Sequence, residues 1–129
     1  MGRNAQNVLI EKNIVNNIGY FNNNALITNN VLTVPSSECL NSIISCTIQN
    51  NVVVHNGAYY LFYGSSANTV QNNLFVSTYS AGSGNIDKQL LESIFVNYSG
   101  GAFSYEHDFH LKETSLGKNA GTDGTDIGI

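Results

Sequence analysis

The chain is poor in charged residues, proline, cysteine and tryptophan. It has no Trp, one Pro and two Cys, and only 11% of its residues are charged, against about a quarter in an average domain. With 42% hydrophobic residues in 129, it can bury a core of one domain, which excludes global disorder.

The charge that is present argues against nucleic acid as a partner. The net charge is −4, and a protein that tracks phosphates needs a basic stripe. The five cations are scattered and form no stripe: Arg3, Lys12, Lys88, Lys112 and Lys118.

Long apolar runs are also missing. No stretch reaches the length that crosses a bilayer, and residues 1–7 lack the apolar core of a signal peptide. We therefore expect no membrane insertion.

Cys39 and Cys46 are either a disulfide or two small apolar core residues; we favour the second interpretation, and two cysteines do not fix the compartment.

Asparagine is abundant throughout the chain. Its amide competes for backbone hydrogen bonds, so asparagine is disfavoured inside helices and strands and favoured in turns. Four segments that share a pattern align without gaps: residues 7–15, 24–32, 45–53 and 67–75. Each reads aliphatic, polar, Asn (once Lys), Asn, aliphatic, aliphatic. The second Asn recurs at Asn13, Asn30, Asn51 and Asn73, with the first spacing the shortest and the other two nearly equal.

This repeat predicts two short strands joined by a two-residue corner. Asparagine tolerates left-handed backbone angles, so the corner could close a β-hairpin, but hairpins do not usually repeat one corner with the same flanking residues. Successive windings of a solenoid would stack the amides at about 4.8 Å, where they can bond one another. We therefore predict an all-β parallel β-helix of about 4–6 coils with an Asn ladder at one corner. A third strand per coil is expected at residues 18–21, 40–44 and 59–63.

Alternation suggests which residues face inward. We expect the first Asn of each corner to point into the core, so that Ile27, Asn29 and Val31 share one side. The first unit then has Lys12 at the ladder position, which suggests an open end and self-association through an uncapped N-terminal coil. The residues assigned to the ladder corners are Asn13, Asn29, Asn30, Asn50, Asn51, Asn72 and Asn73.

The repeat stops near residue 77, and the charge distribution changes. Residues 1–84 carry four charges that sum to zero, whereas residues 85–129 carry seven acids and three lysines. Because this second region is short for a separate core, we expect one domain over residues 1–129, with repeat coils in 1–84 and a closing wrap in 85–129.

The C-terminal region resembles a known family. The motifs are Gly84-Asn85-Ile86-Asp87, Ile94-Phe95-Val96-Asn97, Asp108-Phe109-His110-Leu111-Lys112 and the stretch Ala120–Ile129. With the Asn-Asn repeats, they resemble the end of secreted, right-handed β-helix repeat proteins of bacteria, the pectate-lyase-like superfamily, in versions common in gut bacteria. Ser93 and Ser115-Leu116 stand where that family usually has proline-containing elements. The resemblance implies a right-handed single-stranded β-helix, a C-terminal portion of a longer protein, and secretion or display at the cell surface.

Catalytic machinery is hard to place on the coils. Active members of that superfamily cut polysaccharides, and hydrolases need paired carboxylates, but the repeats carry only Glu11 and Glu38. The densest polar cluster is a candidate acid/base or metal site: Glu106, His107, Asp108, His110 and Lys112. We favour the plainer interpretation, a strand with Phe109 and Leu111 buried and His110 on the surface.

No metal or other cofactor is expected. Asp123 and Asp126 resemble a calcium loop only superficially, because the closing Glu of an EF-hand is absent, so turn capping is the favoured interpretation.

The aromatic run offers carbohydrate-binding candidates: Tyr59, Tyr60, Phe62 and Tyr63. The same rings would otherwise fill the core or cover a neighbouring coil. His55 is expected at the surface.

Three functions follow from these observations. The first, which we prefer, is a non-catalytic β-helix module of a carbohydrate-active or cell-surface bacterial protein that binds polysaccharide weakly. The second is a polysaccharide lyase or glycoside hydrolase, or a fragment of one. The third is a structural, adhesin-like stalk.

Overall fold

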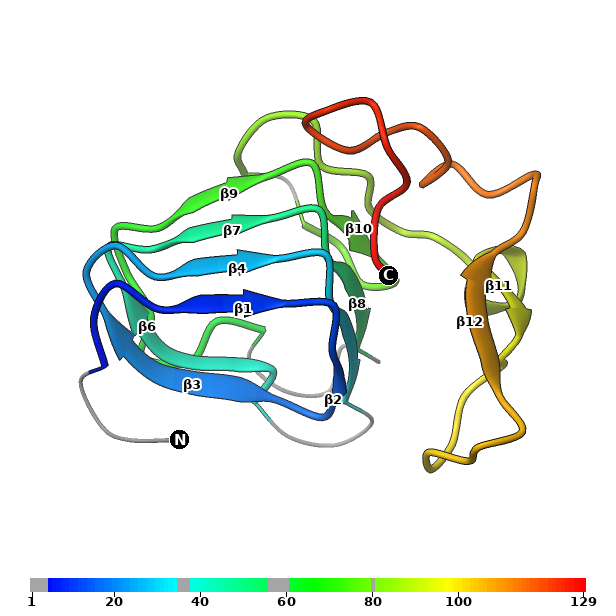
Figure 1. The fold of residues 1–129 in the computed structure, drawn as a ribbon, viewed down its shortest axis with the longest axis horizontal. Coiled ribbons are helices and arrows are strands. Elements are labelled where there is room, and N and C mark those ends of the chain that lie inside the picture. The colour runs from blue at the N-terminus through cyan, green and yellow to red at the C-terminus, as the bar shows by residue number, and fades with distance from the viewer. Residues whose placement is uncertain (1–4, 35–37, 56–60, 80) are drawn as a thin grey trace.

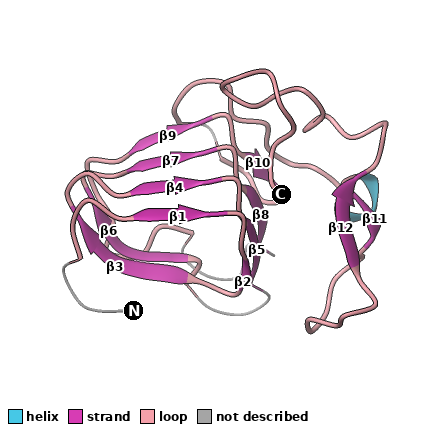
Figure 2. Cartoon of the chain, in the orientation of Figure 1, coloured by secondary structure: helices cyan, strands magenta, loops and turns pink. Residues whose placement is uncertain are grey.

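The computed structural model describes residues 5–34, 38–55, 61–79 and 81–129, without the side chains of Asn22 and Val34. In these ranges the chain is all-β, with one short 3-10 helix, η1 (Leu91–Ser93), and no α-helix (Figures 1 and 2). The strands are β1 (Leu9–Glu11), β2 (Ile14–Val15), β3 (Ile18–Asn22), β4 (Leu26–Thr28), β5 (Val31–Val34), β6 (Leu40–Ile44), β7 (Thr47–Gln49), β8 (Val52–His55), β9 (Thr69–Gln71), β10 (Leu74–Phe75), β11 (Phe95–Asn97) and β12 (Asp108–Leu111).

Strands β1 to β10 form three parallel sheets. Their orders are β1-β4-β7-β9, β10-β8-β5-β2 and β3-β6. Strands of different sheets follow one another along the chain, so each winding visits the sheets in turn, an arrangement consistent with a β-solenoid (Figure 1). Leu9 pairs with Leu26, Leu26 with Thr47, and Thr47 with Thr69. The strands therefore pair with the same unequal offsets that separate the repeated corners in the sequence.

The third side of the windings was only partly predicted. β3 and β6 occur where third strands were expected, so even the short first winding holds three strands. Tyr59 and Tyr60 lie outside the described residues, and residues 61–64 form a turn instead of a strand. This turn still lies beside β6, because Leu61 and Tyr63 accept backbone hydrogen bonds from Leu40 and Ser42.

The second asparagine of each corner builds a continuous amide ladder. The Nδ2 of Asn13 donates to the Oδ1 of Asn30 at 3.1 Å, Asn30 to Asn51 at 3.0 Å, and Asn51 to Asn73 at 3.0 Å. Asn73 in turn donates to Asn85 at 3.2 Å. Each Oδ1 also accepts the backbone N–H of the preceding ladder residue. Asn30, Asn51 and Asn73 are fully buried, and these bonds satisfy their polar groups.

The expectation that the first corner residue points inward was wrong. Asn29, Asn50, Asn72 and the equivalent Lys12 have φ between 49° and 56°, in the left-handed region, and do not join the ladder. A residue with left-handed backbone angles turns the chain, so the alternation of side chains between the two faces of a strand does not continue through the corner. The inward side therefore holds Ile27, Asn30 and Leu32, while Val31 belongs to a second cluster on the outside of β5. Lys12 is exposed at the corner, and Asn13 takes the ladder position.

Two apolar cores lie on opposite sides of one sheet. The interior of the windings contains stacked residues such as Ile27, Ile48 and Val53, with the free, buried thiols of Cys39 and Cys46. Burial raises the pKa of the Cys39 thiol. The outer row Val31, Val52 and Leu74 is covered by the C-terminal segment through residues of the antiparallel pair β11–β12 and Ile127 (Figure 1).

The C-terminal region thus covers a flank as well as an end. Ser83 and Ile86 pair in parallel with Gln71 and Leu74 and form a last, short layer over β9 and β10. The Nδ2 of Asn85 donates to the carbonyl oxygens of Val70 and Ala81, which ends the ladder. The repeat therefore extends to residue 86, slightly beyond the expected boundary at residue 84.

Replacing a buried ladder residue should destabilise the protein strongly. In Asn51→Leu, the amide of Asn30 loses its acceptor and the carbonyls of Ile27 and Gln49 lose a donor. Because buried unpaired polar groups are costly, we expect the free energy of unfolding to fall by at least ~3 kcal/mol in urea denaturation. The control Asn16→Leu, at an exposed position, should change it by less than ~0.5 kcal/mol. Equal effects of the two substitutions would contradict the structural role of the ladder.

Candidate functional site

Strand β12 carries the polar cluster singled out from the sequence. Phe109 and Leu111 are buried and His110 is exposed, as the strand interpretation predicted. The Nδ1 of His110 lies 2.6 Å from the Oδ1 of Asp108, and the two side chains are 82% and 42% exposed. The same carboxylate oxygen accepts the backbone N–H of His110 at 3.0 Å. These bonds, backbone first, and the nearby imidazole hold the pKa of Asp108 below its ordinary value of 3.8.

The other members of the cluster point elsewhere. The Nζ of Lys112 donates to the backbone oxygen of Glu92 at 2.6 Å. His107 accepts the backbone N–H of Ser104 through Nδ1 at 3.2 Å and packs edge-on against Tyr98. Glu106 is exposed. Of the five candidates, the structure joins only Asp108 and His110 by a side-chain hydrogen bond, so they are the single pair here with the geometry for proton exchange.

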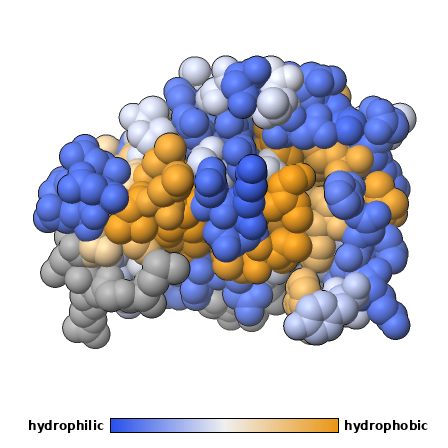
Figure 3. Space-filling view, in the orientation of Figure 1, coloured by the Kyte–Doolittle hydropathy of each residue, from blue (hydrophilic) through white to orange (hydrophobic). Residues whose placement is uncertain are grey.

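An aromatic patch lies at the connection between β11 and β12, which we call the hairpin tip (residues 98–107). Phe103 is 50% exposed and Tyr105 is 97% exposed, and their rings meet edge to face at 5.3 Å. Phe103 lies parallel to the buried ring of Phe109, with centroids 6.3 Å apart. The tip projects from the body at the lower right of Figures 1 and 3. It therefore presents aromatic surface to solvent on a buried aromatic support.

Hydrogen bonds fix the shape of the hairpin tip. Ser104 accepts the backbone N–H groups of Glu106, through Oγ, and of His107, through its carbonyl. The hydroxyl of Tyr98 donates to the carbonyl of Gly101 at 3.1 Å, and Asn97 donates from Nδ2 to the carbonyl of Glu106 at 2.9 Å. The exposed rings are thus carried by a closed turn.

Of the four carbohydrate-binding candidates in the aromatic run on the coils, the structure describes Phe62 and Tyr63. Tyr59 and Tyr60 lie outside the described residues. Phe62 packs toward the interior, with its ring 5.4 Å from that of Tyr79, while Tyr63 is 49% exposed. Sequence reasoning missed Phe103 and Tyr105, although two aromatic residues within a stretch of small and polar residues were a usable signal.

Two further expectations can be compared with the structure. His55 is buried, not at the surface: its Nδ1 lies 3.3 Å from the Oγ of Ser77, and burial lowers its pKa. Asp123 caps a turn, because it accepts the backbone and hydroxyl groups of Thr125, and Asp126 pairs with Lys118 at 2.8 Å. Among the described residues, no three His, Cys, Asp or Glu side chains are grouped for metal binding.

The first corner asparagines have a different partner from the one expected. Asn50 exchanges hydrogen bonds with Thr122: its Nδ2 donates to Oγ1 at 3.0 Å, and its Oδ1 accepts the backbone N–H at 2.9 Å. Asn72 donates from Nδ2 to the carbonyl of Ala120 at 3.0 Å. These residues therefore attach the C-terminal segment to successive corners.

Comparisons with known proteins give no relative: no protein family, curated protein or solved structure matches this chain. Within the ranges that the structure describes, no helix has the length and apolar character needed to cross a bilayer.

The Asp108–His110 contact can be tested by titration. A carboxyl group whose pKa is lower in the folded than in the unfolded state stabilises the folded state at pH values above the pKa of the unfolded state. This contribution is lost as the pH falls through the lower pKa of the folded state. In His110→Ala the imidazole is removed but the backbone N–H remains, so the pKa of Asp108 should rise yet stay below 3.8. Carbon-detected NMR of the carboxyl group measures this. The control Glu113→Gln should leave the pKa of Asp108 unchanged, and an unchanged pKa in His110→Ala would refute the contact.

Proposed function

We propose that this chain is a right-handed β-helix module of the pectate-lyase-like type, without catalytic activity of its own, that binds polysaccharide weakly. It would belong to a secreted or cell-surface bacterial protein that acts on carbohydrate. Support comes from the Asn-Asn repeat, the parallel sheets and the buried amide ladder. Right-handedness is the strong preference for connections between parallel strands of one sheet.

The observation that carries the binding proposal is the pair of exposed rings at the hairpin tip. Aromatic rings supply large contact areas with little loss of conformational freedom, and the flat faces of sugar rings are suited to stack on them. Phe103 is supported from below by Phe109, and the turn around Ser104 is closed by hydrogen bonds. The tip is therefore preorganised, which lowers the entropic cost of binding.

The charge of the surrounding region suggests the class of glycan. Residues 85–129 carry seven acids and three lysines, and Glu106 is exposed beside Tyr105 in the tip. Carboxylates near the site repel a polyuronate, and the repulsion is strongest at low ionic strength. A neutral polysaccharide is therefore the proposed ligand.

The alternative, a polysaccharide lyase or hydrolase or a fragment of one, draws on the Asp108–His110 pair. The pair borders a shallow hollow that is also lined by Ile14 and Ile129. Two-carboxylate hydrolysis requires a second acid about 5–10 Å away, and Asp108 is the one acid among the described residues that line this hollow. Lys112 is bound to the Glu92 carbonyl. The non-catalytic module is therefore preferred, and a structural stalk is the function that would remain if no glycan binds.

Affinity gel electrophoresis tests the proposal. Neutral polysaccharides such as xyloglucan or hydroxyethyl cellulose should retard the protein, and polygalacturonate should not. In Tyr105→Ala we expect about a tenfold loss of affinity, equal to ~1.4 kcal/mol, because one stacking contact is removed. Tyr63→Ala makes the same chemical change at an exposed tyrosine of the coils and serves as the matched control.

Each outcome of this experiment has a distinct meaning. Loss of retardation in Tyr63→Ala but not in Tyr105→Ala would move the site to the coils and refute the hairpin tip. Retardation by polygalacturonate alone would refute the neutral ligand. Turnover of any of these polysaccharides that Asp108→Ala abolishes would establish the enzyme instead.

A further inference from the structure

The hollow beside the Asp108–His110 pair adjoins the hairpin tip and has a volume of about 350 Å³. Its lining residues come from the tip, from β12 and from β2, and include His107, Asp108, Phe109, His110 and Ile14. The ring centroid of Phe109 lies 6.3 Å from that of Phe103 and 5.9 Å from that of His107. One buried ring therefore joins the exposed aromatic surface of the tip to the polar hollow.

Hydrogen bonds determine which nitrogen of each histidine carries a proton. The Nδ1 of His107 accepts the backbone N–H of Ser104, so it has no proton, and the Nε2 of this ring is a donor. The Nδ1 of His110 lies 2.6 Å from the Oδ1 of Asp108, and it is the donor because an ionised carboxylate only accepts. In the neutral ring of His110, Nε2 is then an acceptor. The two imidazoles on this hollow therefore have opposite hydrogen-bonding roles.

Polar atoms of this hollow remain available to a ligand. Among the described residues, none bonds the Nε2 of His107, the Nε2 of His110 or the Oδ2 of Asp108. The other carboxylate oxygen, Oδ1, accepts two hydrogen bonds from His110, which hold the carboxylate in place. The hollow therefore offers one donor and two acceptors, and the carboxylate among them is already oriented.

We propose that this hollow is a second subsite of the polysaccharide site and selects sugar units with two neighbouring free hydroxyls. One hydroxyl donates to the Oδ2 of Asp108, and the other accepts from the Nε2 of His107. Ile14 and Phe109 contact the C–H groups of the sugar ring. This subsite rests on the proposed binding of neutral polysaccharide at the hairpin tip, and it names the chemical group that is recognised.

The mixture of donor and acceptors favours hydroxyls over charged groups. A hydroxyl both donates and accepts, so a pair of hydroxyls can bond the carboxylate and the imidazole together. The carboxylate of a uronate has no proton to donate, and it would face the like charge of Asp108. The same residues therefore recognise a neutral sugar and disfavour an acidic one.

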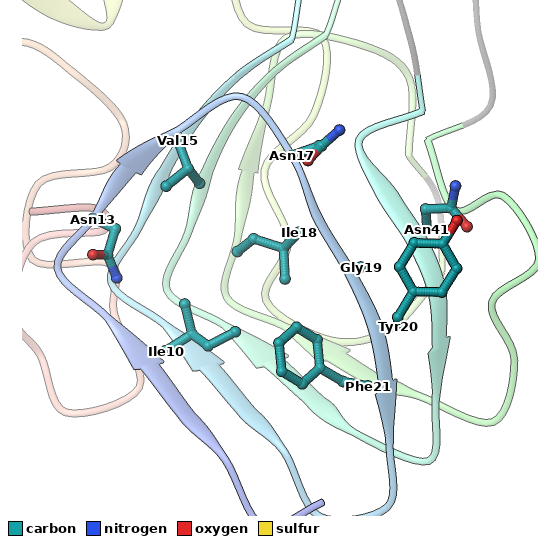
Figure 4. A pocket seen from close by; sticks show the side chains of 9 residues that line it. All are labelled: Ile10, Asn13, Val15, Asn17, Ile18, Gly19, Tyr20, Phe21 and Asn41. Atoms are coloured by element: carbon teal, nitrogen blue, oxygen red, sulfur yellow. The ribbon is translucent and has the colours of Figure 1, made fainter. Parts of the chain in front are cut away.

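The hollow on the first winding differs in kind. It has a volume of about 370 Å³, and Figure 4 shows Ile10, Val15, Ile18 and Phe21 around it. The described residues that line it include no carboxylate, imidazole or ammonium group. It therefore lacks the ionised acceptor on which the proposed selection of hydroxyls depends.

The probes are two neutral polymers with one backbone, hydroxyethyl cellulose and methyl cellulose, in affinity gels compared with a polymer-free gel. Methyl ethers replace hydroxyl donors, whereas hydroxyethyl groups end in new hydroxyls. We expect methyl cellulose to bind about fivefold more weakly, because the hydroxyl that donates to Asp108 is lost. In Asp108→Ala this preference should disappear. In His110→Ala, a change at an 82% exposed side chain that orients the carboxylate, it should decrease.

The control Glu113→Ala removes another carboxylate, which is 92% exposed and does not line the hollow, and it should leave the preference unchanged. Circular dichroism checks that each variant is folded. Equal binding of both polymers by the unaltered protein, or an unchanged preference in either folded variant, would overturn the subsite; binding that still depends on Tyr105 would keep the tip as the glycan site. Retardation by neither polymer would overturn the subsite together with the function on which it rests.

Discussion

The structure depends on the burial of one carboxamide per winding. A polar side chain in the interior of a narrow solenoid is costly unless all its hydrogen-bonding groups are used, and a single asparagine cannot satisfy itself. Asn30, Asn51 and Asn73 solve this collectively, since each bonds its neighbours above and below as well as nearby carbonyls. Because these hydrogen bonds form only when the strands of successive windings are in register, the ladder also fixes how the windings align. Slippage by one residue would leave several buried groups without partners.

Much of the fold follows from the spacing of asparagines. Strands β1, β4, β7 and β9 pair with the offsets that separate the repeated corners in the sequence. The parallel sheets follow from this register. Which asparagine lies inside did not follow, because strand alternation was extended across a corner. The left-handed angle of Asn29 and its equivalents breaks that alternation, and both residues of an Asn-Asn pair tolerate such an angle. Only the three-dimensional corner distinguishes the two positions.

The candidate site was harder to predict than the fold. The strand at Asp108–Leu111 was anticipated from its alternation, with His110 outside and Phe109 inside. The exposed rings of Phe103 and Tyr105 belong to an irregular turn, where no period indicates which side chains face solvent. His55 was misplaced because a strand end looks exposed in sequence, whereas in the structure it lies against Ser77 of the next winding. Sequence patterns report repeating neighbours well and single tertiary contacts poorly.

The hydrogen bonds between residues 120–122 and the corner asparagines have a consequence for biosynthesis. Asn50 and Thr122 are far apart in the chain, and Ile127 completes the cover over Val31, Val52 and Leu74. During synthesis the windings emerge from the ribosome before residues 94–127, so their outer aliphatic row stays uncovered until that segment follows. A nascent chain stalled before residue 127 would therefore expose this apolar row to chaperones and to aggregation.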